Sequence, residues 1–181
     1  MSGLFGNRAT AAIDHRGFQD GLVIANVYVA GQNITPTDNA HYDQYLIHNA
    51  LRSTASRLSQ IDASWRQSHQ VSGESLAHTF NGLWESDQWS EYDVFDWQPC
   101  TGSFRCAVIP QGNELQLCCA RHDSPMAIFA VAIDPRRVAD NLLDARRHIV
   151  DTSPNPHLVL DPKRQGTSDQ TDCQTNPKSA T

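Results

Sequence analysis

Lysine is nearly absent from this chain. Of its fourteen basic residues, twelve are arginine and only two are lysine. Both lysines, Lys163 and Lys178, lie near the C-terminus, so residues 1–161 contain none. A Schiff-base lysine and the phosphate-binding lysine of a Walker loop are therefore excluded from residues 1–161.

Other signals are missing as well. No apolar run approaches the ~20 residues of a membrane helix, and Met1–Arg8 has neither the basic start nor the apolar stretch of a secretory signal. The cysteines are odd in number, which predicts reduced thiols in the cytoplasm rather than a disulfide framework. They are Cys100, Cys106, Cys118, Cys119 and Cys173.

Motifs for cofactors are also absent. The chain contains no G-x-G-x-x-G, no C-x-x-C and no H-E-x-x-H, so we expect no cofactor and no metal. The net charge of −6 argues against direct binding to a nucleic acid. The sequence does not predict an oligomeric state.

The apolar pattern predicts a single α+β domain over residues 1–161. Residues 22–30 read as a strand, and residues 103–133 read as a three-stranded antiparallel meander. The last strand of that meander, Met126–Ile133, is almost continuously apolar, which is typical of a central strand covered on both faces. Residues 162–181 have no aromatic or large aliphatic side chain, so we expect a disordered tail.

Helices are predicted at about 36–61, 73–84 and 135–150, and a short edge strand at 157–160. The first helix would start at Thr35-Pro36, with a threonine cap and a proline at the first position. Its apolar stripe contains Leu51, and this phase places His48 on the opposite, solvated face. The antiparallel or mixed sheet would be covered by the helices at 36–61 and 135–150.

One cluster of residues suggests a cysteine enzyme. Cys118 precedes His122 and Asp123 by a few residues, and a thiol near a histidine and a carboxylate can form a nucleophilic site. Buried cysteines in strands are also common packing residues. A hydrolase or transferase that uses Cys118 and His122, with Asp123 beside them, is therefore the alternative function.

The most unusual stretch runs from Trp84 to Trp97 and combines five acidic residues, five aromatic residues and no basic residue. Aromatic side chains dominate binding hot spots, and acidic residues around them select a basic partner. The residues predicted to bind a partner are Trp84, Trp89, Tyr92, Asp93, Asp96 and Trp97.

Two other interpretations of this stretch stay open. The rings can instead pack inward over the sheet while the acidic residues face solvent. Trp84, Trp89 and Trp97, with Asp93 and Asp96, can also line a pocket for a carbohydrate or another small ligand.

The leading interpretation is a small acidic protein-binding module rather than an enzyme. Inhibitors, immunity proteins, chaperones of basic clients and adaptors are proteins of this kind. We expect a protein partner with a basic surface, and we expect neither a nucleic acid nor a membrane as a direct partner.

Overall fold

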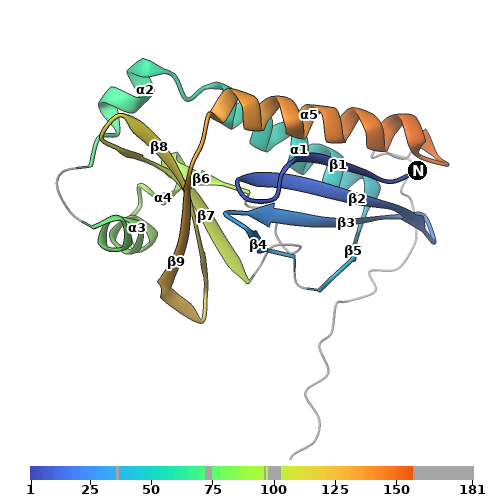
Figure 1. Ribbon diagram of the computed structural model, residues 1–181, viewed down its shortest axis with the longest axis horizontal. Coiled ribbons are helices and arrows are strands. Elements are labelled where there is room, and N and C mark those ends of the chain that lie inside the picture. The colour runs from blue at the N-terminus through green and yellow to red at the C-terminus, as the bar shows by residue number, and fades with distance from the viewer. Residues whose placement is uncertain (36, 72–74, 96, 98–102, 157–181) are drawn as a thin grey trace, which may run out of the picture.

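The computed structural model describes residues 1–35, 37–71, 75–95, 97 and 103–156. These residues form two antiparallel sheets and five helices, which confirms the predicted α+β class (Figure 1). The expected edge strand at 157–160 and the expected tail at 162–181 lie outside the described residues. No helix in the described part of the chain is long and apolar enough to cross a membrane.

The first sheet, sheet A, contains β1 (Gly3–Asn7), β2 (Ala11–Gln19), β3 (Leu22–Val29), β4 (Gln32–Asn33) and β5 (Ala40–Tyr42). The second, sheet B, contains β6 (Asp93–Val94), β7 (Phe104–Gln111), β8 (Glu114–Arg121) and β9 (Ser124–Ala132). The helices are α1 (Gln44–Ser59), α2 (Ala63–Ser68), α3 (Leu76–Trp84), α4 (Trp89–Tyr92) and α5 (Pro135–Thr152).

The order of elements repeats within the chain. Strands β1–β3 form an antiparallel meander that is followed, after β4 and β5, by α1. Strands β7–β9 form a second meander that is followed by α5. The last strands of the two meanders differ: β3 also pairs with β4 and β5, whereas β9 pairs only with β8 among the described residues.

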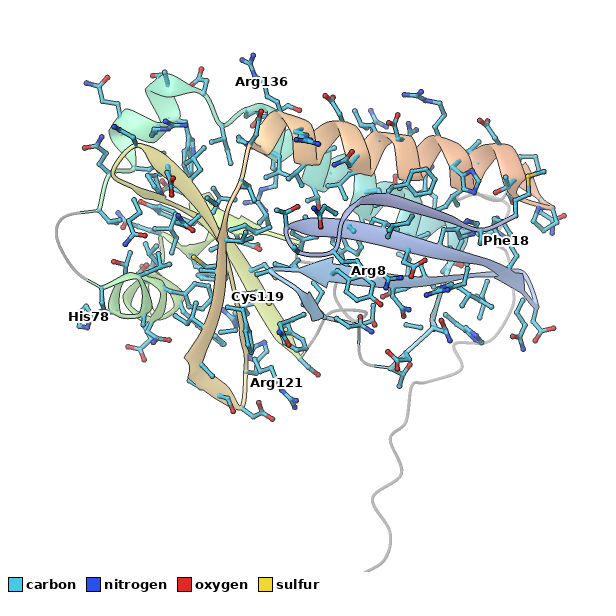
Figure 2. All side chains as sticks on the ribbon, in the orientation of Figure 1. Arg8, Phe18, His78, Cys119, Arg121 and Arg136 are labelled. Atoms are coloured by element: carbon cyan, nitrogen blue, oxygen red, sulfur yellow. The ribbon has the colours of Figure 1, made fainter. Side chains whose placement is uncertain are left out.

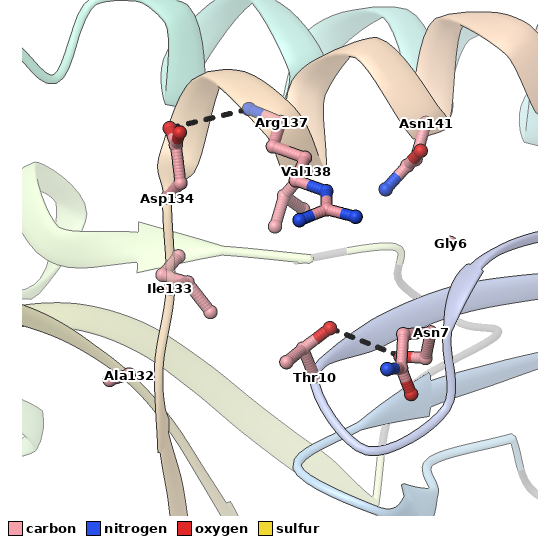
Figure 3. A pocket seen from close by; sticks show the side chains of 9 residues that line it. All are labelled: Gly6, Asn7, Thr10, Ala132, Ile133, Asp134, Arg137, Val138 and Asn141. Carbon is pink, nitrogen blue, oxygen red and sulfur yellow. Dashed lines mark hydrogen bonds between the residues drawn. The ribbon is translucent and has the colours of Figure 1, made fainter.

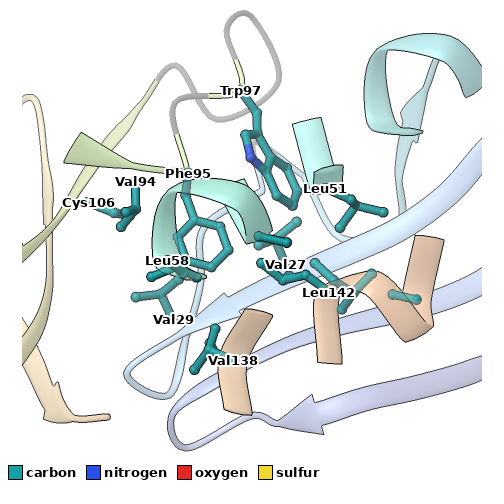
Figure 4. Close-up of a cluster of buried hydrophobic side chains, with 14 of the residues drawn as sticks. Val27, Val29, Leu51, Leu58, Val94, Phe95, Trp97, Cys106, Val138 and Leu142 are labelled. Carbon is teal, nitrogen blue, oxygen red and sulfur yellow. The ribbon is translucent and has the colours of Figure 1, made fainter. Parts of the chain in front are cut away.

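One apolar core joins the two sheets. Helices α1 and α5 pack against each other, and α5 also covers β1 and β2. Leu51 and Leu58 of α1 meet Leu142 of α5 and Val27 of β3 in this core (Figure 4). A second, smaller cluster lies on the other face of sheet B, where Phe80 of α3 packs with residues of β7 and β8.

The first predicted helix begins later than expected. Helix α1 starts at Gln44, and Asp43 caps it by accepting hydrogen bonds from the backbone N–H groups of Tyr45 and Leu46 at 2.9 and 3.0 Å. The hydroxyl of Thr35 instead bonds within its own loop, and residues 40–42 pair with β3. Strand pairing across the chain therefore overrides the local Thr-Pro helix signal.

His48 is not on a solvated face. Only 5% of its surface is exposed, and its Nε2 accepts hydrogen bonds from Nε and Nη2 of Arg146 at 3.2 and 3.0 Å. Helix α5 packs over this side of α1, so the polar residues of α1 that face α5 are buried along with the apolar stripe.

The placement of the last meander strand is also different from the prediction. Strand β9 is the outer strand of sheet B and not a central one. The helices predicted at 73–84 and 135–150 correspond to α3 and α5, with bounds that differ by at most three residues. Ser75 and Asp134 cap them, and Pro135 occupies the first turn of α5.

Candidate interaction surface

The acidic aromatic segment divides into a buried part and a half-buried part. Tyr92, Asp93 and Trp97 are 7%, 8% and 5% exposed, whereas Trp84 and Trp89 keep part of their rings at the surface. Asp96 lies outside the described residues. The residues predicted to bind a partner therefore do not form one continuous surface.

Trp97 belongs to the main core. Its ring packs beside Phe95 at a centroid distance of 5.5 Å, and its indole N–H donates a 2.8 Å hydrogen bond to the hydroxyl of Thr54 on α1 (Figure 4). Trp84 and Trp89 pack against the other cluster, on the opposite face of sheet B. The small-ligand interpretation requires Trp84, Trp89 and Trp97 to line one pocket. The structure does not bring Trp97 together with the other two rings.

Asp93 and Tyr92 border a hollow of about 260 Å³ between α1, α2 and α4. The guanidinium of Arg57 lies 3.5 Å from the Asp93 carboxylate and also donates to the carbonyl of Ser90. Burial, reinforced by the neighbouring Glu91, raises the pKa of the Tyr92 hydroxyl. These contacts hold α4 against α1, so we interpret Asp93 and Tyr92 as structural residues.

His69 occupies the same hollow. Its ring stacks on Trp65 at 4.2 Å, and its Nε2 lies 3.1 Å from a carboxylate oxygen of Glu91. The ring also meets the edge of Tyr92. The imidazole is therefore held on three sides, which leaves it little freedom to act on a bound molecule.

Trp84 and Trp89 form a half-exposed pair with a cation already above them. Their ring centroids are 6.0 Å apart, and the guanidinium of Arg105 lies 4.7 Å from the Trp84 ring and 5.5 Å from the Trp89 ring. His122 meets the edge of Trp84 at 5.1 Å. Arg105 thus makes a cation–π contact with both rings from within the chain itself.

The sequence analysis does not single out Arg105, although strand alternation indicates which face of β7 it lies on. Strand alternation sends Arg105 to the face opposite Phe104 and Cys106, which is the face that also carries Ile109 and Cys118. No sequence pattern, however, places Trp84 and Trp89 on that face, because a helix and a loop separate them from β7.

Cys118 is a packing residue of the smaller cluster. It is fully buried, and burial, followed by the influence of Cys119, raises the pKa of its thiol to about 12. The thiol contacts the carbonyl oxygen of Gln116 at 3.7 Å. A cysteine that remains a thiol at neutral pH is a poor nucleophile.

The other two residues of the cysteine hypothesis have separate partners. His122 contacts Trp84 and Arg105, while the carboxylate of Asp123 is paired with Arg121 at 2.9 and 3.0 Å. The three side chains do not converge on one point in the described structure, which therefore gives the enzyme hypothesis no support. Likewise, no group of three potential metal ligands occurs among the described residues.

The outer edge of β9 pairs with no other strand among the described residues. The backbone N–H of Ile133, next to the strand, donates to the carbonyl of Leu115 on β8 at 2.9 Å. Because N–H groups point alternately to the two sides of an antiparallel strand, those of Ala132 and Ala130 point away from β8. No strand in the described part of the chain bonds to these backbone groups.

The side chains of β9 are unusual for such an edge. Residues 124–133 carry no charge, and the side chains of Ala127, Ala130 and Ala132 are exposed. Ile128, Phe129 and Val131 are half-buried. Edge strands commonly carry lysine or other charged residues that discourage pairing, and β9 has none.

Comparisons with known proteins do not identify a family: no family model matches the chain, and neither a curated protein nor a solved structure is significantly similar to it.

Proposed function

We propose that this chain is a protein-binding module that takes an extended segment of a partner protein onto the open edge of β9. The observation that carries the proposal is the combination of outward backbone groups at Ala130 and Ala132 with a strand of nine uncharged residues. Strand addition uses such an edge: backbone hydrogen bonds supply affinity, and alternate side chains supply specificity.

The first half of the molecule offers a direct comparison. The corresponding outer edge of β3 is closed by β4, through Tyr28 and Asn33, and by β5, through Val23 and Tyr42. An exposed apolar edge invites association with other chains. A partner strand on β9 would close sheet B in the same way as β4 and β5 close sheet A.

Charge favours a basic partner over a second copy of the chain. Each copy carries a net charge of −6, so two copies repel each other, while a segment with lysine or arginine beside its apolar residues is attracted. Glu85, Asp87 and Glu91 are exposed around α3 and α4, next to Trp84 and Trp89. These acidic residues would steer the approach of such a segment.

The proposal keeps the chain within the inhibitor, immunity, chaperone and adaptor classes and places it in the cytoplasm, where cysteines stay reduced. Of its cysteines, Cys106, Cys118 and Cys119 are described, and all three are free thiols.

Ala130→Pro tests the proposal directly. Proline removes the outward N–H of residue 130 but no hydrogen bond to β8, so sheet B should tolerate it. Twelve-residue peptides selected from a random library on the unmodified protein serve as the probe, and their affinities are measured by fluorescence anisotropy. We expect apolar peptides flanked by basic residues, at least tenfold weaker binding to Ala130→Pro, and a change below twofold for the control Ala130→Ser.

Two results would contradict the proposal. Equal peptide affinity for Ala130→Pro and the unmodified protein would show that binding does not use the edge. A concentration-dependent dimer in analytical ultracentrifugation, lost in Ala130→Pro, would show that the edge pairs with a second copy instead. Circular dichroism of both variants establishes that the fold is intact.

A further inference from the structure

A cavity of about 340 Å³ lies where the two sheets meet (Figure 3). Its walls come from the turn between β1 and β2, from the connection between β9 and α5, and from the first turns of α5. The polar groups in its lining are those of Asn7, Thr10, Asp134, Arg137 and Asn141. Its volume is within the range of small-molecule sites, about 300–1,000 Å³.

Hydrogen-bond donors dominate two opposite walls of this cavity. The guanidinium of Arg137 and the side-chain amide of Asn141 extend from α5, and the side-chain amide of Asn7 faces them from the turn (Figure 3). The hydroxyl of Thr10 also lines the cavity, but it donates to the carbonyl oxygen of Asn7 at 3.2 Å. In the described part of the chain, neither the Arg137 guanidinium nor the Asn141 amide has a hydrogen-bond or ion-pair partner. The Asn7 amide oxygen is used by the backbone N–H of Ala9 at 2.8 Å, which leaves the Asn7 NH₂ group as a donor.

The one carboxylate in the lining is already engaged. Oδ1 of Asp134 caps α5 by accepting from the backbone N–H groups of Arg136 and Arg137 at 3.0 and 3.4 Å. The backbone N–H groups at the start of α5 therefore already have an acceptor in Asp134. A ligand would be held by side chains, with Arg137 as the cation.

Gly6 forms part of one wall of the cavity. A Cβ at this position would come within 2.3 Å of the carbonyl oxygen of Ala11 on β2, and its φ of +94° lies in the region that favours glycine. Any other residue at this position is therefore strained. Ile133 and Val138 supply the large apolar side chains of the lining, and Val138 lies beside Arg137 (Figure 3).

We infer that this cavity binds a small molecule that carries a carboxylate or a phosphate group. The planar guanidinium of Arg137 can donate two parallel hydrogen bonds to two oxygens of such a group. Asn141 and Asn7 supply further donors, and Ile133 and Val138 contact the less polar remainder of the molecule. The inference does not rest on strand addition at β9: Ala132 borders both sites, but the ligand is held by Arg137, Asn141 and Asn7.

Inorganic phosphate and acetate are suitable probes, one for each oxyanion class. Either is titrated into the isotope-labelled full-length protein at constant ionic strength, and the side-chain NH₂ signals of Asn7 and Asn141 and the Nε–H signal of Arg137 are followed by NMR. We expect saturable shifts in these signals for at least one probe. The probe that binds more tightly identifies the class of the natural ligand.

Arg137→Gln and Arg136→Gln form a matched pair. Both arginines lie in the first turn of α5 and are exposed, and both changes remove one positive charge. Arg136, however, borders a separate hollow beside Ile61 and Gln70 (Figure 2). We expect binding at least tenfold weaker for Arg137→Gln and a change below twofold for Arg136→Gln. Shifts that do not saturate, or equal losses in both variants, would overturn the inference.

Discussion

Trp97 and Trp89 belong to the same acidic aromatic segment but lie on opposite faces of sheet B. Trp97 is enclosed by the main core and bonded to Thr54, whereas Trp89 is half-buried beneath Arg105 and beside Phe80. Both residues are tryptophans, and each has acidic residues nearby in the sequence. The difference arises from the elements packed against each ring, so the two residues should respond differently to truncation.

Trp97→Ala should lower the free energy of unfolding by ~3–5 kcal/mol, because it opens a large cavity and leaves the Thr54 hydroxyl without its donor. Trp89→Ala should cost less than ~2 kcal/mol, since part of the ring already faces solvent. Urea unfolding followed by circular dichroism measures both values. Equal costs, or a larger cost for Trp89→Ala, would mean that the core does not enclose Trp97.

Two buried histidines should make stability depend on pH. Burial, followed by the nearby His148, lowers the pKa of His15 from 6.5 to about 4, and Nδ1 of His15 has no hydrogen-bond partner among the described residues. Burial, followed by the positive charges of Arg146 and Arg52, lowers the pKa of His48 to about 4 as well. Both rings are therefore neutral in the folded protein at physiological pH.

Below pH 6.5 these histidines bind protons more readily in the unfolded chain than in the folded one. Stability should therefore be complete above pH 6.5 and fall as the pH drops toward 4, by up to ~3 kcal/mol for each histidine. Unfolding in urea at pH 7 and pH 4.5 measures the loss. His15→Leu should reduce it, and the control His41→Leu, at an exposed position, should leave it unchanged.

Among the elements, those with local signals were predicted most accurately. Helix α5 was predicted at 135–150 and spans 135–152, because Asp134 and Pro135 mark its start and its apolar stripe is continuous. The predicted start of helix α1 was wrong, because residues 40–42 pair with β3 instead of joining the helix. No motif near residues 35–42 indicates this pairing. Local sequence cannot report such pairing.

Strand β9 and the aromatic segment illustrate the same limit. An apolar run such as 126–133 is compatible with a covered central strand or with an exposed edge, and its neighbours decide between the two. The sequence singled out the segment from Trp84 to Trp97 correctly as unusual. It could not assign each ring to a face of sheet B, because that assignment depends on β7 and α1.

The buried side of α1 that faces α5 can be tested by a pair of substitutions. Leu51→Ala should destabilise the protein by ~2–5 kcal/mol through the cavity it leaves. His48→Ala should cost ~1–3 kcal/mol, because Arg146 then loses its acceptor at a partly buried position. Thermal or urea unfolding compares the two variants. A loss below ~0.5 kcal/mol for His48→Ala would contradict the packing of α5 on this side of α1.

At the scale of the whole molecule, two meanders share one core. Helix α5 follows the second meander in the chain but covers β1 and β2 of the first meander. The single domain over residues 1–161 and the disordered tail over residues 162–181 stay predictions.

Truncation after Pro162 should leave the melting temperature unchanged within about 2 °C, because residues 163–181 offer no large apolar side chain to bury. Differential scanning calorimetry of the truncated and full-length chains measures the difference. A drop clearly beyond 2 °C would show that the C-terminal residues dock on the folded body.

The position of α5 also sets the time at which the chain can fold in the cell. Sheet A is complete in sequence early, but α5, which packs on β1 and β2, starts more than a hundred residues after β2. A ribosome that adds 5–20 residues per second needs roughly 5–20 s for that distance. The parts of β1 and β2 that α5 covers therefore stay uncovered during that time, and the native core closes only after α5 has been synthesised.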